Sequence, residues 1–478
     1  MSNKVKVAGT WREVSMPYVK VAGVWKPAKA VYNKVAGKWY SSFLRGGVND
    51  FGFATYDYAN KANAQVGGSV GKSLAIQPDG KILVCGTFTT WNGVTVGRIV
   101  RLNTDGTVDT TFQTNIGTGP NSSVFTITVN TDGTIFVGGG FTTWNGTPVG
   151  YMVKLSATGT LDTTFNTNIG TGASGSVYAI TVNTDGTILV GGNFITWNGT
   201  TVGRMVKLSA AGVRDTTFNT NIGTGANSVV NAITVNTDGT ILVGGSFGTW
   251  NGTTVGYMVK LSAAGVRDTT FTTNNGTGAN STINAIAVNT DGTILAGGGF
   301  TTWNGTAVGR MVKLSAAGVR DTTFTTNNGT GANDSVFAIT VNTDGTILVG
   351  GNLTAWSGTT VGRMVKLSAA GVRDTTFQTN IGTGSNSSVF TITVNTDGTI
   401  LVGGNITTWN GTTVGYMVKL SAAGVRDTAF QTNIGTGANS RVSLIAISPD
   451  KKAIVTGEFT GYNSINRTFI ARIGGELA

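Results

Sequence analysis

A repeat of 53 residues constrains the fold of this chain more than any other feature. An aspartate recurs at this interval at one corner of the repeat, at Asp79, Asp132, Asp185, Asp238, Asp291, Asp344, Asp397 and Asp450. An aromatic residue twelve positions later keeps the same step, at Trp91, Trp144, Trp197, Trp250, Trp303, Trp356, Trp409 and Tyr462. No insertion interrupts the spacing, so the fold has to accommodate eight near-copies of one structural unit.

Each copy is expected to form four short antiparallel strands. Glycine makes up 72 of the 478 residues and charged residues only 12%, which is the composition of a turn-rich all-β protein. Alternation predicts that Phe337, Ile339 and Val341 face one side of a first strand. The Asp-Gly corner that follows predicts a type I′ turn. The remaining strands, in an earlier copy, are expected at Thr187 to Phe194, Val202 to Leu208 and Val213 to Phe218.

Four antiparallel strands repeated in series predict a β-propeller, with a β-solenoid as the alternative. Eight blades are favoured, and seven remain open if the last copy is a cap. The first three strands occur eight times, but the complete fourth strand occurs only seven times downstream of Val48 to Phe51. Val48 to Phe51 resembles the missing fourth strand, so we expect it to close the ring and remove the exposed edges of an open array.

The first 42 residues carry a second, smaller repeat. A Lys-Val-Ala-Gly-x-Trp pattern recurs every 14 residues, with its glycines at positions 9, 23 and 37. Each unit predicts a β-hairpin that is too small to bury a core alone, so it has to stack on neighbours or on another chain. The two interpretations are a small β cap and a module for attachment or self-association. The residues that would make the attachment are Lys6, Trp11, Lys20, Trp25, Lys34 and Trp39.

The positive charge of the chain is concentrated near its start. Of the net charge of +11, residues 1–45 carry +8, and the remaining 433 residues carry only +3. Because binding to phosphates needs clustered positive charge, the repeats are not expected to bind nucleic acid. No apolar run approaches the length of a membrane helix, and the start of the chain lacks the apolar region of a signal peptide, so neither membrane insertion nor conventional export is expected.

The residue types that support catalysis are scarce. The chain has no histidine and three glutamates, and its recurring aspartates fall in turns or in Asp-Thr-Thr-Phe segments, where we expect structural roles. Cys85 is the only cysteine and is interpreted as a small core residue. A calcium site needs several clustered oxygen ligands, which one aspartate per corner does not supply. No enzymatic activity, cofactor or metal site is therefore expected.

Two recurring positions are the candidates for ligand binding. The tryptophans of the Trp-Asn-Gly corners, namely Trp91, Trp144, Trp197, Trp250, Trp303, Trp356 and Trp409, offer aromatic faces for a sugar, although packing against the next blade is the alternative. Arginine alternates with tyrosine at a second position, and both residue types are favoured in binding surfaces. The arginines there are Arg98, Arg204, Arg310 and Arg363, and surface decoration without a partner is the alternative.

Two resemblances extend this interpretation. Ile76-Gln-Pro-Asp-Gly-Lys-Ile-Leu-Val84, together with the Trp-Asn-Gly and Gly-x-x-Asp-x-x-Phe segments that follow, resembles the delta-60 repeat β-propeller family over residues 43–478. That resemblance implies a propeller in a bacterial, phage or surface-associated setting and no agreed activity. The hairpin pattern of residues 1–42 resembles repeats found at the ends of phage tail and virion proteins.

The sequence as a whole favours a non-enzymatic virion protein of a phage tail fibre or baseplate periphery. Residues 1–42 would attach it to other virion proteins, and the propeller of residues 43–478 would bind a receptor or glycan on a host surface. Self-association of the chain stays open. The alternatives are a lectin or adhesin on a bacterial surface or outside the cell, and a structural spacer without a ligand.

Overall fold

A computed structural model describes six strands within residues 1–42, residues 66–67, and residues 70–473 except 92–93, 104–106, 237, 290, 448–452, 464 and 467–469. Contacts divide the chain into two compact units, Met1–Ser42 and Phe43–Ala478. The segment expected to close the ring, Val48 to Phe51, lies outside the described residues.

The first unit contains three antiparallel hairpins, as the 14-residue repeat predicts. The lysine and the tryptophan of each copy are directly paired in register: Lys6 with Trp11, Lys20 with Trp25 and Lys34 with Trp39. The strands are β1 (Lys4–Val7), β2 (Thr10–Glu13), β3 (Tyr18–Val21), β4 (Val24–Pro27), β5 (Asn33–Val35) and β6 (Lys38–Tyr40).

The second unit repeats one blade. Each blade has a three-stranded antiparallel sheet, in which the second strand of the copy lies between the first and the third. Eight such sheets occur within the described residues, so the all-β class and the propeller repeat are confirmed. Their strands are β8 (Val70–Ile76), β9 (Ile82–Gly86), β12 (Ile99–Leu102); β13 (Val124–Val129), β14 (Ile135–Gly139), β17 (Met152–Leu155); β18 (Val177–Val182), β19 (Ile188–Gly192), β22 (Met205–Leu208); β23 (Val230–Val235), β24 (Ile241–Gly245), β27 (Met258–Leu261); β28 (Ile283–Val288), β29 (Ile294–Gly298), β32 (Met311–Leu314); β33 (Val336–Val341), β34 (Ile347–Gly351), β37 (Met364–Leu367); β38 (Val389–Val394), β39 (Ile400–Gly404), β42 (Met417–Leu420); and β43 (Val442–Ile447), β44 (Ala453–Gly457), β47 (Ile470–Ile473).

A short hairpin at the Trp-Asn-Gly corner and, in seven copies of the described part of the chain, a helix complete the blade. The hairpin strands are β10 (Thr90–Trp91), β11 (Val94–Thr95), β15 (Thr143–Trp144), β16 (Thr147–Pro148), β20 (Thr196–Trp197), β21 (Thr200–Thr201), β25 (Thr249–Trp250), β26 (Thr253–Thr254), β30 (Thr302–Trp303), β31 (Thr306–Ala307), β35 (Ala355–Trp356), β36 (Thr359–Thr360), β40 (Thr408–Trp409), β41 (Thr412–Thr413), β45 (Gly461–Tyr462) and β46 (Ile465–Asn466). The helices are α1 (Thr110–Ile116), α2 (Thr163–Ile169), α3 (Thr216–Ile222), α4 (Thr269–Asn275), α5 (Thr322–Asn328), α6 (Thr375–Ile381) and α7 (Thr428–Asn433), and β7 (Val66–Gly67) pairs with the hairpin of the first copy.

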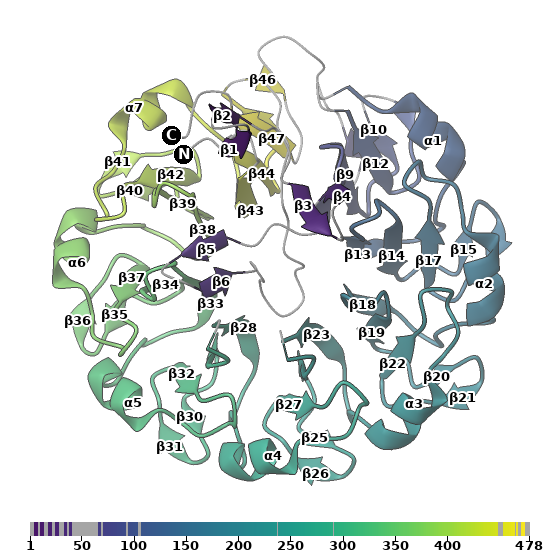
Figure 1. Cartoon of the computed structure of the whole chain (residues 1–478). Helices are drawn as coiled ribbons and strands as arrows, with labels where there is room; N and C mark the ends of the chain where they lie inside the picture. Colours follow the sequence, from purple (N-terminus) through teal and green to yellow (C-terminus); the bar gives the residue numbers. More distant parts are fainter. Residues whose placement is uncertain are drawn as a thin grey trace. The chain divides into compact units, whose positions relative to one another are not determined.

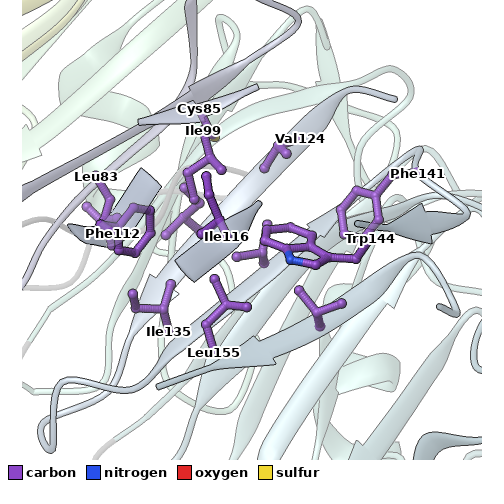
Figure 2. Close-up of a cluster of buried hydrophobic side chains, with 14 of the residues drawn as sticks. Leu83, Cys85, Ile99, Phe112, Ile116, Val124, Ile135, Phe141, Trp144 and Leu155 are labelled. Atoms are coloured by element: carbon purple, nitrogen blue, oxygen red, sulfur yellow. The ribbon is translucent and has the colours of Figure 1, made fainter. Parts of the chain in front are cut away.

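The blades are arranged in a ring (Figure 1), and hydrophobic side chains pack between neighbouring blades. Each buried cluster takes side chains from two consecutive copies; the one drawn in Figure 2 combines Leu83 and Phe112 of the first copy with Ile135 and Trp144 of the second. One further cluster joins the first copy to the eighth, through Leu74, Ile454 and other residues. The ends of the array are therefore in contact through side chains of the described residues.

The fourth strand expected at Val213 to Phe218 is not formed as such. A single antiparallel bridge between Leu208 and Arg214 takes its place, and helix α3 begins two residues later. Asp215 caps this helix, because its side chain accepts a hydrogen bond from Phe218 N at 2.9 Å. The buried residues of this helix, Phe218 and Ile222, are four positions apart, which places them on one face of a helix.

The type I′ turn was expected at the wrong corner. At Asp344-Gly345 only the glycine has a positive φ, and a hydrogen bond from Gly345 N to Asn342 O closes the turn. The two-residue loop at Asn198-Gly199 has φ of 46° and 75°, and it joins Trp197 directly to Thr200. Positive φ at both central residues is the property of a type I′ turn, so this turn occurs at the Trp-Asn-Gly corners.

Within the described residues, the basic residue of the third strand links each of the first six blades to the next. Lys154 Nζ lies 3.1 Å from the capping Asp162 of its own blade and 3.3 Å from Ala210 O of the following copy. Five more copies pair the basic residue with the capping aspartate: Arg101 with Asp109, Lys260 with Asp268, Lys313 with Asp321, Lys366 with Asp374 and Lys419 with Asp427. The structural role predicted for the Asp-Thr-Thr-Phe aspartates is confirmed in these copies.

Among these capping aspartates, Asp109 is the one with two cationic partners. It is 5% exposed, and its Oδ2 lies 2.7 Å from Lys81 Nζ and 2.9 Å from Arg101 Nη2. Burial alone would raise the pKa of this carboxyl, but hydrogen bonds from Lys81 and Phe112 N and the charge of Arg101 outweigh that effect and lower it to about 2. Asp109 is therefore an ionised anchor of the first blade at neutral pH.

Two buried asparagines depart from the apolar pattern. The last residue of the helix is isoleucine in α2, α3 and α6, but it is Asn275 in α4 and Asn328 in α5. Both are 1% exposed. Among the described residues, neither side-chain polar atom of Asn328 has a hydrogen-bond partner. The Asn275 side chain, in contrast, donates from Nδ2 to Val255 O at 3.3 Å. Because an unsatisfied buried amide costs stability, we expect Asn328 to weaken the packing of α5.

We expect Asn328→Ile to raise the free energy of unfolding by about 1 to 3 kcal/mol, because it removes an unpaired buried amide and restores the residue of other copies. Thermal or denaturant unfolding measures the change. The matched control is Ile222→Asn in α3, which should lower stability by a similar amount. Loss of stability in Asn328→Ile would show that the amide has partners that the isoleucine cannot replace.

Lowering the pH should remove the contribution of the ionised Asp109 side chain to the free energy of unfolding. Since its pKa falls from the usual 3.8 to about 2 on folding, the stabilisation is complete above about pH 4 and is lost as the pH falls to about 2. It amounts to about 2 kcal/mol. The stability difference between the wild type and Asp109→Asn, measured by unfolding at pH 7, 4 and 2, should therefore shrink on acidification. Asp162→Asn, at a more exposed carboxyl, serves as the control with a smaller change. A difference that does not vary with pH would contradict the lowered pKa.

Candidate functional site

The corner tryptophans do not form a sugar-binding surface. Trp144, Trp197, Trp250, Trp303, Trp356 and Trp409 are each 1% exposed, and Trp91 is 3% exposed. Trp144 packs with Phe141 at 5.8 Å between ring centroids, in an edge-to-face arrangement inside the core (Figure 2). Because a sugar has to reach the face of an aromatic ring, the ligand-binding hypothesis for these tryptophans is wrong, and the packing alternative holds.

The aspartates of the recurring Asp-Gly corners stabilise their turns by accepting hydrogen bonds. Asp185 Oδ1 accepts hydrogen bonds from Thr187 N and Oγ1 at 2.8 and 2.6 Å, and Asp132, Asp238, Asp291, Asp344 and Asp397 repeat this arrangement. Burial opposes ionisation of Asp185, but these bonds and the charge of Lys207 leave its pKa below the usual value. A carboxylate held ionised in a turn is an acceptor and not a general acid.

Three positions that change chemical character between copies two and seven meet at one end of each blade. The first, near the start of the first strand, is occupied by Phe125, Tyr178, Asn231, Asn284, Phe337 and Phe390. The second, just after the second strand, is occupied by Gly140, Asn193, Ser246, Gly299, Asn352 and Asn405. The third, just before the third strand, is occupied by Tyr151, Arg204, Tyr257, Arg310, Arg363 and Tyr416. We call these residues the variable rim.

Hydrogen bonds show that the three positions are neighbours. Arg204 Nη1 donates to Asn193 Oδ1 at 2.7 Å, and Arg363 Nη1 donates to Asn352 Oδ1 at 2.6 Å. Asn231 Nδ2 lies 3.4 Å from Ser246 Oγ. The residues at the first position are half-buried except Asn231, which is exposed, and those at the third position are all half-buried. The variable rim is therefore accessible to a ligand, at the opposite end of the strands from the aspartate turns.

A β-bulge presents the first position. In the sixth copy Val336 pairs with Gly351 and Ala338 with Gly350, so Phe337 has no partner in the ladder. The same shift occurs in copies two to five and in copy seven. The expectation that Phe337 lies on one face with Ile339 and Val341 was wrong, because the extra residue at the bulge interrupts the alternation and leaves Phe337 half-buried, whereas Ile339 is buried.

The third position has a strained backbone. Arg98, Tyr151, Arg204, Tyr257, Arg310, Arg363 and Tyr416 all have positive φ, between 57° and 70°. This left-handed region is unfavourable for large side chains and suits glycine or asparagine. The same chain uses asparagine at the left-handed Trp-Asn-Gly turns, for example at Asn304. Arginine and tyrosine are thus retained at the rim despite a backbone cost, which is a feature of functional positions.

The sequence identified only part of this site. It singled out Arg204, Arg310 and Arg363, which belong to the rim, and Arg98, which occupies the same position in the first copy. Arg98 donates to Pro120 O at 2.6 Å and Arg310 to Gly299 O at 3.1 Å. The first and second positions were missed, although a position-by-position comparison of the copies reveals them. No cluster of metal-binding side chains and no helix suited to spanning a membrane occurs in the described part of the chain.

Among solved structures, the chain is similar to the extracellular domain of a hybrid two-component system from B. thetaiotaomicron, with 12% identity and a TM-score of 0.41. The alignment covers 87% of this chain and 48% of that one, so this chain spans about half of that structure. The WD40 β-propeller domain of Doa1 shares 14% identity, with coverage of 73% and 89% and a TM-score of 0.37. PorZ, a surface component of the type-IX secretion system of Porphyromonas gingivalis, shares 14%, with coverage of 94% and 57% and a TM-score of 0.35.

No curated protein matches the chain. A family model described as a β-propeller domain of unknown function, DUF5122, matches eight segments. They are residues 77–112, 131–165, 184–218, 237–271, 290–324, 343–377, 396–430 and 448–474, and together they make up more than half of the chain. Each of the first seven segments starts near the aspartate turn and ends at the phenylalanine of an Asp-Thr-x-Phe helix. The chain therefore belongs to the DUF5122 β-propeller family.

Proposed function

We propose that this protein is a non-enzymatic component of a virion, at the periphery of a phage tail, that binds a host surface through the variable rim. In this proposal the three hairpins of residues 1–42 attach the chain to other virion proteins. The propeller of residues 43–478 displays the rim. The basic character of residues 1–45 and the lysine–tryptophan pairs of the hairpins support the attachment role.

The observation that carries the proposal is the contrast between scaffold and rim. The turns, helix caps and core residues of copies two to seven are nearly identical, whereas aromatic, amide and arginine side chains exchange at the rim positions. If the third position had no functional constraint, residues that tolerate a left-handed backbone, such as glycine or asparagine, would be expected there. Arginine or tyrosine occupies it in every one of these copies. A repeated scaffold that varies at a few accessible positions is suited to recognition.

The residue inventory supports binding over catalysis. The chain contains no histidine. The recurring aspartates are engaged in turns and helix caps, and burial raises the pKa of the Cys85 thiol, which is 0% exposed. These groups supply neither a nucleophile with a base nor a general acid at the rim. We therefore assign no reaction to the protein.

Labelled full-length protein is expected to bind the surface of some strains in a panel of bacterial cells, measured by flow cytometry. Changing Arg204, Arg310 and Arg363 together to asparagine should reduce binding by about tenfold or more, because each is a hot-spot residue type at an accessible position. The control variant changes Arg214, Arg320 and Arg373, which lie away from the rim, in the same way. Wild-type protein that binds no strain would overturn the proposal, as would equal losses in the two variants.

The backbone cost at the rim gives a second prediction. Arg310→Asn should leave the melting temperature unchanged or raise it, because asparagine tolerates the left-handed φ of 63° found there. The reverse change, Asn304→Arg, should lower stability by about 1 kcal/mol or more. Thermal unfolding of the two variants makes the comparison. If Arg310→Asn is as destabilised as Asn304→Arg, the arginine has a structural role and its retention needs no ligand.

A further inference from the structure

The variable rim is not uniform, and a dense polar network lies in copies six and seven. Asn352 is the centre of this network. Its Nδ2 donates to Asp334 Oδ2 at 2.6 Å, and its Oδ1 accepts from Arg363 Nη1 at 2.6 Å and from Ser388 Oγ at 3.0 Å. All four side chains are half-buried, so their positions are fixed while part of each remains accessible. We call these four residues the Asn352 cluster.

An aromatic pair lies on the same side of the same two blades. The rings of Phe337 and Phe390 are 5.4 Å apart with an interplanar angle of 32°, and the Arg441 guanidinium lies 5.3 Å from the Phe390 ring. Both phenylalanines are half-buried at the β-bulges of β33 and β38. Rigid rings beside oriented amide, carboxylate and guanidinium groups supply both an apolar contact and directional hydrogen bonds.

The charges of this region cancel. Arg363 and Arg441 are positive, whereas Asp334 and Glu458 are negative, and Arg441 forms an ion pair with Glu458. An anionic ligand would meet two carboxylates here, and a cationic ligand would meet two guanidinium groups. The electrostatics therefore favour an uncharged ligand that both donates and accepts hydrogen bonds.

We propose that the Asn352 cluster and the Phe337–Phe390 pair form a binding site for a neutral sugar unit of a surface glycan. The hydroxyl groups of a sugar donate to Asp334 and accept from Arg363, and its C–H face packs on phenylalanine. This inference rests on the proposed host-surface function and names the chemical class of the ligand. It relocates glycan recognition from the buried tryptophans to the accessible rim.

Other copies provide internal comparisons. Copies two and three have an aromatic pair, Phe125 and Tyr178, with rings 5.2 Å apart, but their equivalents of Asp334 are Ser122 and Gly175. Copies four and five have Asn231 and Asn284 at the first position and hence no aromatic pair. Copies six and seven together combine an aromatic pair with the acid, amide and arginine of the Asn352 cluster. The residues of the other copies also define substitutions that the blade already accommodates.

The test uses the full-length chain on an array of neutral hexose and N-acetylhexosamine oligosaccharides, with sialylated and sulfated oligosaccharides as the acidic arm. We expect binding to neutral members. Asn352→Gly and Phe390→Asn, each the residue of another copy, should weaken it by about tenfold or more, because each removes an oriented contact. Their melting temperatures should stay close to that of the wild type. The matched control is Phe125→Asn at the second aromatic pair, which should retain binding at the Asn352 cluster.

A second arm separates this inference from the proposed function. Cells that bind the protein are treated with periodate, which cleaves sugar diols, or with protease. Loss of binding after periodate alone supports the inference. Binding to cells that survives periodate, together with no binding to the array, would overturn the sugar site and leave the host-surface role standing. Binding to the array without binding to any cell would support the sugar site and contradict the host-surface role. Preference for the acidic arm would contradict the choice of a neutral ligand.

Discussion

The close packing of each blade against the next is the interaction on which the rest of the structure depends. The middle strand contributes a glycine at this contact, and a Cβ on Gly297 would lie 2.6 Å from Val336 Cγ1 of the following copy. A larger residue would push the sheets apart, so glycine sets their separation. The basic residue of the third strand reinforces the same contact, because Lys260 pairs with Asp268 of its own blade and donates to Ala316 O of the next.

Periodicity made the propeller predictable, but local detail was less so. The 53-residue step, the Asp-Gly corners and the apolar second strand required repeated antiparallel sheets whatever the details. The helix at Thr216–Ile222 was missed because Val213 to Phe218 is compatible with a short strand, and Asp215 reveals itself as a cap only if the chain continues as a helix. The bulge at Phe337 was missed because alternation assumes an uninterrupted ladder.

The candidate site was predictable only in part for a related reason. Burial of Trp250 depends on packing between copies, which one copy in isolation does not show. The arginine position was identified because its alternation with tyrosine is visible in the sequence, but its left-handed backbone is not. Phe390 and Asn352 were not identified from the sequence, because only the fold places these half-buried residues at the same end of neighbouring blades. The sequence therefore located single residues, and the tertiary structure supplied their grouping.

The near-identity of the blades affects how the ring assembles. Since the interfaces of the middle copies are almost interchangeable, those contacts do not specify which blade should neighbour which during folding. The first copy differs, with a buried Arg101 that donates to Gln77 and to Ala157 of the second copy. The first and eighth copies also share a cluster of their own. These two blades differ from the middle copies, so their shared contact is distinct from the repeated interfaces between the middle blades.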